Sequence, residues 1–420
     1  MGRDRSAGDI VIVGYDMVTP LGVELKAQWE AFAAGRSGVG WVTRFEHGDG
    51  FPVRVAGQVP KVDFSKRSFW NERDAANWFS PVIFHSMLVA ERALEHARFA
   101  VDGSNADRVA VTFSSAIGGL DAMIEAESKV NAGLTPHPFT NPNGCLNMVA
   151  GKVSILTGAR GPIFCPVAAC ATGSASVASA AMLLASGRAD VVIAGACDFP
   201  VVRSLMASFA SMNGAFQSRK PDDRAFDDPT KVSRPFSRDR KGFVVSEGAA
   251  ALVVTTRGHA DRLGLEVRAV IEGIGMTSDA SHYVAPNLPT IAACIRAALA
   301  DARLSPDDID AVNAHAASTS VGDATEVKAL DEVFGARRIP VSANKSQIGH
   351  SMGASSAVEL ILAIEGLRRG VLLPTINYDP DPKVPVDAVP EGARPMEQRR
   401  VLSNSFGFGG CNVCLVVGRE

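Results

Sequence analysis

Cys170 stands where a short apolar run meets a helix built almost wholly from Ala, Ser, Met and Leu. The run, residues 163–167, is expected to be a buried strand, and a helix without a polar face is expected to be buried on all sides. Free N–H groups and the positive end of the helix dipole would favour a thiolate at Cys170. The segment therefore predicts a cysteine nucleophile, with a small apolar core residue as the alternative.

Two histidines lie in loops of small residues. His315 ends the predicted strand 311–314, and His350 stands just before the predicted helix 354–368. Side chains at the C-terminal ends of parallel strands usually face the functional crevice of an α/β protein. One cysteine with two histidines fits covalent acyl transfer, although either histidine alone could be structural. The other six are assigned to surface or core: 47, 85, 96, 137, 259 and 282.

The sequence Gly-Phe-Gly-Gly at residues 407–410 is a second candidate element of the site. Glycine lets the backbone approach a ligand closely, so these residues could aim N–H groups at a developing oxyanion or simply form a tight turn. No dinucleotide-binding or phosphate-binding glycine motif follows a strand, so the chemistry is expected to need no cofactor. The seven cysteines are scattered, which predicts neither a disulfide framework nor a zinc site.

Composition limits the class of protein. The 420 residues are 46% hydrophobic and 21% charged, with a formal net charge of −3. This balance is ordinary for a globular protein and argues against general nucleic-acid binding. The polar N-terminus is not a signal peptide, and no apolar run is long enough to span a bilayer. We therefore expect a cytoplasmic protein without a membrane partner.

The elements that must position these residues alternate between strand and helix, which predicts an α/β fold with parallel strands. The two halves, 1–256 and 257–420, have a similar alternation of strands and helices.

Ser305 and Asp308 fit a helix capping signal, and the polar segment 212–239 is expected to be a long surface excursion. Strands are predicted at 9–15, 108–114, 189–196, 249–254, 266–276, 311–314, 339–342, 401–405 and 411–417; helices at 26–34, 81–97, 145–157, 289–302, 323–334 and 354–368.

Taken together, these segments resemble the β-ketoacyl-[acyl carrier protein] synthases, the condensing enzymes of fatty acid and polyketide synthesis. The resemblance covers nearly the whole chain. Its most specific segments are ACATG at 169–173, NAH at 313–315, KSQIGH at 345–350, SNSFGFGG at 403–410 and several residues of 234–248. The resemblance implies a thiolase-like fold, in which two pseudo-equivalent βαβαβαββ halves form a five-layered α/β/α/β/α arrangement. It places Cys170 in the half 1–256 and both histidines in the half 257–420.

The resemblance also implies a mechanism. Cys170 would attack an acyl thioester on an acyl carrier protein and hold the acyl group. His315 and His350 would then promote decarboxylation of a malonyl thioester by stabilising negative charge on its oxygen. The backbone N–H groups of Cys170 and Phe408 would form the oxyanion hole, and Phe408 would gate the acyl pocket.

Further residues take implied supporting roles. Lys345 would be the active-site lysine with Glu326 as its ion-pair partner, and Glu359 a buried acid near His350. Ile117 would line the acyl pocket, and Gly409 would lie at the substrate site. Glu359 could also join a structural cation site that some relatives have, together with Asn313, Ser403 and Asn404.

Several departures from the family pattern stand out. One of two threonines that bind the pantetheine arm is Ala317 here, so only Thr319 remains, and a threonine after the glycines is Cys411. The basic run expected at the carrier-protein dock is thin, because Arg73 lies beside Glu72 and Asp74. Lys66 and Arg67 were the available substitutes in this stretch.

The resemblance implies a homodimer, but the departures leave open a specialised pathway enzyme or a catalytic subunit paired with a non-catalytic chain-length partner. Two other classes were weighed. A coenzyme A-dependent thiolase would need a second reactive cysteine before the C-terminal glycines, whereas Cys411 follows them. A non-catalytic partner chain would typically lack the nucleophile that Cys170 supplies.

Overall fold

A ten-stranded sheet runs through the protein in the order β10-β9-β13-β14-β8-β1-β7-β6-β4-β5. The structure is a computed structural model that describes residues 6–48, 50–218, 228–335 and 337–420. The strands of this sheet are β1 Ile10–Val18, β4 Val109–Ser114, β5 Ile163–Phe164, β6 Val191–Asp198, β7 Gly248–Thr256, β8 Ala269–Ser278, β9 Ala311–Asn313, β10 Val341–Ser342, β13 Arg400–Gly407 and β14 Cys411–Gly418. Two small ladders accompany it: β2 Val39–Trp41 with β3 Val55–Gly57, and β11 Val371–Leu372 with β12 Arg394–Pro395.

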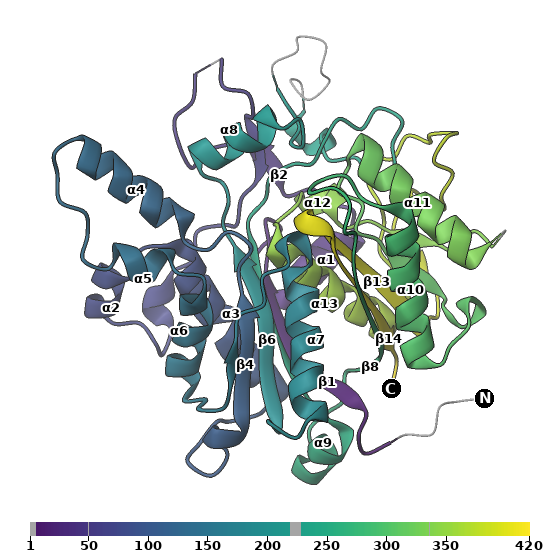
Figure 1. Cartoon of the computed structure of the whole chain (residues 1–420), viewed down its shortest axis with the longest axis horizontal. Helices are drawn as coiled ribbons and strands as arrows, with labels where there is room; N and C mark the ends of the chain where they lie inside the picture. The colour runs from purple at the N-terminus through teal and green to yellow at the C-terminus, as the bar shows by residue number, and fades with distance from the viewer. Residues whose placement is uncertain (1–5, 49, 219–227, 336) are drawn as a thin grey trace.

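The helices connect these strands and cover both sides of each half of the sheet (Figure 1). Their bounds are α1 Leu25–Ala33, α2 Glu72–Asn77, α3 Pro81–Ala97, α4 Leu120–Asn131, α5 Thr140–Gly144, α6 Asn147–Thr157, α7 Thr172–Ala185, α8 Arg203–Ser211, α9 Arg257–Leu263, α10 Leu288–Ala302, α11 Ser320–Phe334, α12 Lys345–Ile348 and α13 Gly353–Arg369. Sequence analysis predicted the long core helices and missed the short or exposed ones, α2, α4, α5, α8, α9 and α12.

The sheet consists of two equivalent halves. In β5-β4-β6-β7-β1, β7 runs antiparallel to the other four strands, which are parallel to one another. The other half, β10-β9-β13-β14-β8, repeats this pattern. A short antiparallel ladder between β1 and β8 joins the halves. With α3, α6 and α7 in one half and α10, α11 and α13 in the other, each half has the predicted order βαβαβαββ.

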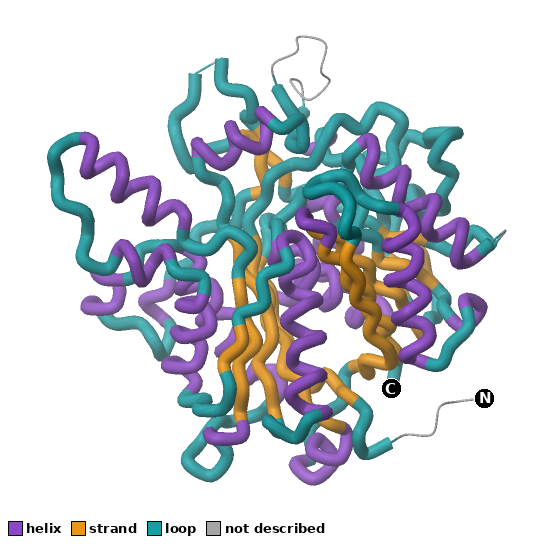
Figure 2. Tube along the Cα trace, viewed as in Figure 1, coloured by secondary structure: helices purple, strands orange, loops and turns teal. Residues whose placement is uncertain are grey.

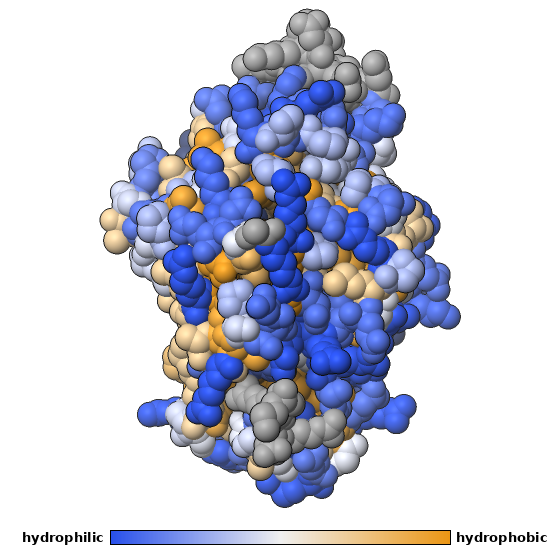
Figure 3. Space-filling view, turned by 90° about the vertical axis from the view of Figure 1, so that its right-hand side faces the viewer, coloured by the Kyte–Doolittle hydropathy of each residue, from blue (hydrophilic) through white to orange (hydrophobic). Residues whose placement is uncertain are grey.

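Alternating side chains on the strands show how the layers stack. On β7, Ala250, Leu252 and Val254 join the core that contains residues of α7 and α13, while Ala249 and Val253 face the core under α3. A third core lies beneath α10 and α11. The helices α7 and α13 therefore form a central layer between the two sheet halves, and the five-layered arrangement is confirmed (Figure 2). The outer face over α10 and α11 is largely hydrophilic (Figure 3).

The strand before Cys170 differs from the prediction. Ile163 and Phe164 form β5, but their side chains are 45% and 51% exposed, and Val167 is 49% exposed. The reason is topological, because β5 is the last strand of the sheet and has a neighbour on one side only. The helix α7 is buried as expected except near its C-terminal end, where Met182 is exposed. The predicted surface excursion 212–239 lies partly outside the described residues.

Candidate active site

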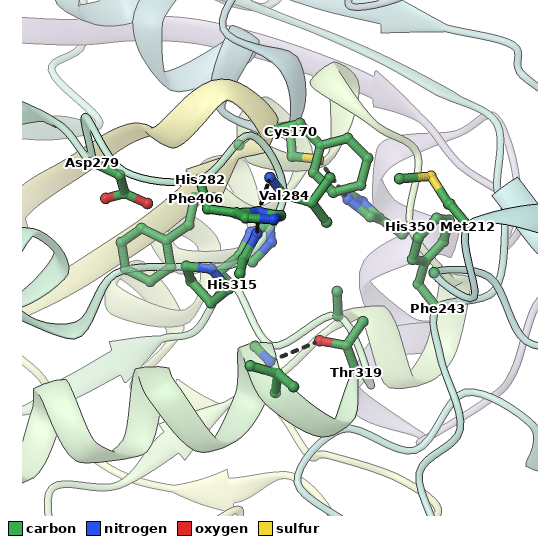
Figure 4. A pocket seen from close by; sticks show the side chains of 18 of the residues that line it. Cys170, Met212, Phe243, Asp279, His282, Val284, His315, Thr319, His350 and Phe406 are labelled. Carbon is green, nitrogen blue, oxygen red and sulfur yellow. Dashed lines mark hydrogen bonds between the residues drawn. The ribbon is translucent and has the colours of Figure 1, made fainter.

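The predicted nucleophile and both predicted histidines line one cavity of about 280 Å³. The cavity lies where short 3-10 turns and loops follow the C-terminal ends of strands in both halves. Figure 4 shows Cys170, His315 and His350 facing its interior. Most of the remaining wall is apolar and consists of Met212, Phe243, Val284, Ile291, Met352 and Phe406, among others. The three reactive side chains therefore share a largely apolar chamber.

Cys170 lies in a single 3-10 turn, Ala169–Ala171, directly before α7. The backbone of Ala169 has a φ of +48°, a value that residues other than glycine rarely adopt. The surrounding packing must therefore hold this conformation in place. Gly407 makes this packing possible, because a Cβ there would lie 2.4 Å from the carbonyl oxygen of Ala168. The glycine segment thus allows the turn of the nucleophile to approach β13.

His350 contacts the nucleophile directly, with Nε2 3.0 Å from Sγ of Cys170. On the other side of its ring, Nδ1 lies 2.9 Å from the hydroxyl of Ser355, which fixes the orientation of the imidazole. Burial and the charge of Lys345 hold the pKa of His350 well below its ordinary value. The ring is therefore neutral at physiological pH and able to accept the thiol proton.

Burial also has the largest effect on the pKa of the Cys170 thiol. It raises the pKa of Cys170 to about 12, while the charge of Lys345 and the backbone N–H groups of Phe408 and Cys170 oppose this rise. The helix N-terminus and these donors therefore do not produce a standing thiolate. The backbone N–H groups favour a thiolate as expected, but removal of the sulfur from water raises the pKa by more than they lower it. The resting pair is a neutral thiol beside a neutral imidazole.

His315 faces the same chamber from the end of β9. Its ring centre lies 5.6 Å from that of His350, with the planes nearly perpendicular. The backbone of His315 is held on both sides, since its N–H donates to Glu326 at 2.9 Å and its carbonyl accepts from Lys345 at 2.6 Å. Burial is the main reason why its pKa is well below the ordinary value. Both imidazoles are thus neutral groups that can donate an N–H to a substrate oxygen.

The ion pair of Lys345 differs from the prediction. Its ammonium lies 2.7 Å from both carboxylate oxygens of Glu359, and both side chains are almost fully buried. Glu326 instead accepts the N–H groups of His315 and Ala316 and the amide of Asn404. Burial raises the pKa of Glu359, and the neighbouring ammonium opposes that rise. Glu359 is therefore the ion-pair partner, and Glu326 orients the backbone at His315.

The other predicted substrate residues occupy different positions. Phe408 and Thr319 line the cavity. Gly409 does not, since it is exposed and donates its N–H to the carbonyl of Tyr283 at 2.9 Å. Ile117 packs against the apolar cluster that contains Phe243, behind the cavity wall. Ile117 and Gly409 therefore do not touch the chamber in this conformation.

Two family models, which together span most of the chain, match this sequence and identify its family. Residues 7–260 match the family model described as "Beta-ketoacyl synthase, N-terminal domain", and residues 268–379 match "Beta-ketoacyl synthase, C-terminal domain". The chain belongs to the beta-ketoacyl synthase family.

Similar proteins extend over nearly the full chain. A relative from Rhizobium meliloti, "3-oxoacyl-[acyl-carrier-protein] synthase 2", is 36% identical over 423 residues and covers 98% of each chain. Two solved structures cover 98% of this chain and 99% of their own. A beta-ketoacyl synthase from Burkholderia phymatum has a TM-score of 0.89 at 31% identity, and a type II polyketide ketosynthase solved with its acyl-carrier protein has 0.86 at 26%. The chain is thus a condensing acyltransferase with the thiolase-like fold.

The sequence did not reveal two residues of this beta-ketoacyl synthase, one that lines the cavity and one whose charge acts on Cys170 from outside the lining. His282, assigned above to surface or core, lines the cavity, and its Nδ1 accepts the N–H groups of Val284 and Ala285. Asp198 ends β6 and accepts the N–H groups of Ala116 and Ile117, while burial raises its pKa to about 6. A carboxylate directly after a wholly apolar strand was the available signal for Asp198. His282 lies in a loop whose path the sequence did not reveal.

Lys66 and Arg67, near the expected docking surface for a carrier protein, form ion pairs with acidic residues of this synthase chain. Arg67 is bound by Glu91 and Glu95, and Lys66 lies 3.5 Å from Asp63. The Arg67 guanidinium is thus paired within the chain, whereas the Lys66 side chain is 81% exposed, and the suggestion that these two residues substitute for the missing basic run stays a prediction.

The suggested cation site of the synthase fits only in part. Among the described residues, Oδ1 of Asn313 and Oγ of Ser403 are buried without a hydrogen-bond partner, as cation ligands would be. Both carboxylate oxygens of Glu359, however, are bound by the Lys345 ammonium. Because the carboxylate is already neutralised, this donor set is a weak one for a cation, and we assign no step of the reaction to it.

No helix in the described part of the synthase is both long and apolar enough to cross a bilayer.

Proposed function

We propose that the chain transfers an acyl group from an acyl carrier protein to Cys170 and condenses it with a malonyl thioester. The observation that carries the proposal is the 3.0 Å contact between Nε2 of His350 and Sγ of Cys170, in a chamber that also holds His315. The similarity to 3-oxoacyl-[acyl-carrier-protein] synthase 2 and to a ketosynthase solved with its acyl-carrier protein supports an acyl carrier protein as the donor.

In the first half-reaction, Sγ of Cys170 attacks the thioester carbonyl while its proton passes to Nε2 of His350. The N–H groups of Cys170 and Phe408, which point to the sulfur, would stabilise the oxyanion. The carbon–sulfur bond to the carrier then breaks, and the carrier thiolate takes the proton from His350. The acyl group remains on Cys170, and His350 is neutral again.

In the second half-reaction, His315 and His350 donate N–H groups to the oxygen of the malonyl thioester. His350 does so as the tautomer that carries its proton on Nε2 and accepts from the Ser355 hydroxyl at Nδ1. The bond to the carboxylate breaks, CO2 leaves, and the electron pair forms an enolate that these donors stabilise. The enolate carbon attacks the acyl carbonyl on Cys170, the bond to sulfur breaks, and the Cys170 thiolate takes up a proton from solvent. The product is the β-ketoacyl thioester. Lys345 holds His315 through its carbonyl and disfavours protonation of both imidazoles.

We also propose that the chain forms a homodimer through the edge at β5, with a heterodimer of homologous chains as the alternative. Exposed Ile163, Phe164 and Val167 lie at an unpaired edge, which a second copy would cover. The topological repeat further supports the division of the chain into halves 1–256 and 257–420, because the equivalent strands β1 and β8 each begin one half.

The test is intact mass of the protein after mixing with an acyl-loaded carrier protein, beside the variant Cys170→Ala. An acyl adduct on the wild type that is absent from the variant supports the proposal. An adduct from acyl coenzyme A but from no acyl carrier protein would contradict it and favour a thiolase-like activity. Absence of any adduct would indicate a required partner chain or a non-catalytic role.

A further inference from the structure

Arg240 lies outside the set of reacting groups, yet its side chain is only 7% exposed. Its Nε donates to the carbonyl of Thr319 at 3.0 Å, and Nη2 donates to the carbonyl of Ser320 at 2.9 Å. Two residues further on, the N–H of Gly242 donates to the carbonyl of Ser318 at 2.9 Å. Arg240 and Gly242, which we call the carbonyl clamp, thus hold three consecutive carbonyls of the other half of the protein.

The guanidinium of the carbonyl clamp is itself fixed. Nη1 donates to the carbonyl of Ser237 at 2.8 Å and to Asp381 at 3.0 Å. All three nitrogens of the Arg240 guanidinium therefore donate to an acceptor. A planar guanidinium can make these diverging hydrogen bonds at the same time. Lysine carries a single ammonium on a flexible stem and cannot reach the two successive carbonyls in this fixed geometry.

The loop held by the carbonyl clamp needs such support. Ser318 is fully buried and has a φ of +68°, which is unfavourable for a residue with a side chain. Its hydroxyl accepts the N–H of Arg234 at 3.1 Å, and the N–H of Thr319 donates to Asp323 at 3.1 Å. The segment 234–242 and the start of α11 therefore fix the backbone on either side of Thr319.

Thr319 presents its hydroxyl-bearing side chain to the chamber (Figure 4), and the neighbouring Ser320 also lines it. Oγ1 of Thr319 accepts the N–H of Gly322 at 3.2 Å, and a hydroxyl that accepts one bond still has its own proton to donate. The acceptor that this proton suits is a carbonyl oxygen of a ligand that enters the chamber. On the proposed function, that ligand is the pantetheine arm, whose amides supply such oxygens.

We infer that Arg240 is a positioning residue for the arm, which acts through Thr319 by holding the loop that carries it. This inference rests on the proposed function and adds a determinant of arm binding to it. Arg240 touches no reacting atom, so its loss weakens binding of the arm in the ground state and the transition state alike. Such a loss raises KM and leaves kcat nearly unchanged.

The test compares Arg240→Gln with Arg238→Gln. Arg238 lies in the same segment and carries the same charge, but it is 64% exposed and bonds to Asp379 instead of the loop. We expect Arg240→Gln to raise KM for the malonyl carrier protein about three- to tenfold, with kcat within about twofold, as loss of one or two hydrogen bonds predicts. Arg238→Gln should leave both values within about twofold.

A double-mutant cycle shows whether Arg240 acts through Thr319. In a Thr319→Ala background, Arg240→Gln should have no further effect on KM, because the hydroxyl that it positions is gone. Equal KM values for the Arg240 and Arg238 variants, or additive effects in the cycle, would overturn the inference while the proposed function stands. A wild type that takes no acyl group from a carrier protein would remove the proposed function and the inference together.

Folding is checked by the thermal midpoint and by the rate at which iodoacetamide alkylates Cys170. If Arg240→Gln does not fold, Asp381→Asn replaces it, because this change removes one acceptor of the guanidinium and leaves the arginine in place. A folded Asp381→Asn variant should show the same rise in KM at constant kcat, to a smaller extent. An unchanged KM in that variant would contradict the inference.

Discussion

Nε2 of His350 lies 3.0 Å from Sγ of Cys170, whereas the ring of His315, whose centre lies 5.6 Å from that of His350, makes no hydrogen bond to the sulfur in the described part of the chain. The two histidines are therefore not equivalent, although the sequence presents them alike. His350 can take a proton from the nucleophile and also donate to the malonyl thioester. His315 faces the chamber but does not bond to the sulfur in the structure described, so its role belongs to the second half-reaction.

This difference predicts separable effects of two substitutions. His350→Ala should slow acylation of Cys170 by about 10²–10⁴, the usual contribution of a general base, and should also slow condensation. His315→Ala should leave acylation within about threefold and reduce CO2 release from the malonyl thioester by at least tenfold. Quenched-flow intact mass measures acylation, and trapped CO2 measures decarboxylation. Equal loss of acylation in both variants would contradict the assignment.

The raised thiol pKa predicts how alkylation depends on pH. An acid whose pKa is raised stays protonated above its ordinary value, so the Cys170 thiol is neutral from pH 6 to 9. The thiolate fraction then grows about tenfold per pH unit, and the rate of alkylation by iodoacetamide should rise through this range without a plateau. The variant Cys170→Ala corrects for the other cysteines. A plateau beginning near pH 7 would instead indicate a standing thiolate–imidazolium pair.

The buried pair Lys345–Glu359 predicts a large effect on stability. Lys345→Met leaves the carboxylate buried without its cation, which should lower the free energy of unfolding by about 3–5 kcal/mol. The double variant Lys345→Met with Glu359→Gln should recover more than half of this loss, because no charge is then left uncompensated. Urea unfolding monitored by circular dichroism measures both. Equal stability of the single and double variants would show that the pair is not the cause.

The contact between α7 and α13 predicts that an alanine can be unfavourable within a helix. A Cβ at Gly173 would lie 2.5 Å from the backbone nitrogen of Ala357, and overpacking of this kind costs about 1–3 kcal/mol. The gain in helix propensity is about 1 kcal/mol, so Gly173→Ala should be destabilising overall.

Gly151 in α6 is the matched control for this change. A Cβ there meets only flexible atoms of Met148 at 3.9 Å, so Gly151→Ala should raise the free energy of unfolding by about 0.5–1 kcal/mol. Chemical denaturation of both variants gives the comparison. A stabilising effect of Gly173→Ala would mean that α7 and α13 lie further apart than the structure shows.

Much of the fold was predictable because it depends on local patterns. Alternating strands and helices gave the α/β class, and the stripe of apolar residues in α3 gave its bounds at Pro81–Ala97. The capping pair Ser305 and Asp308 is confirmed, with both reciprocal bonds present. The helices that were missed are short or exposed, so they carry no long apolar stripe by which a sequence pattern could reveal them.

The candidate site was predictable only as a set of residues. The resemblance brought Cys170, His315 and His350 together, and the structure places all three in one chamber. It misassigned the partner of Lys345, because Glu326 and Glu359 are both buried acids on helices and their distances to the ammonium depend on how the helices pack. The sequence likewise did not indicate that His282 would reach the chamber from a loop.

The sequence by itself determined which residues could react and which strands and helices would carry them, because nucleophile, turn and helix are neighbours along the chain. The tertiary structure decided the protonation of the thiol, the pairing of Lys345 with Glu359 and the exposure of β5 at the edge of the sheet. Each of these depends on groups far apart in sequence, through burial, distance and strand order. A local pattern specifies none of those three quantities.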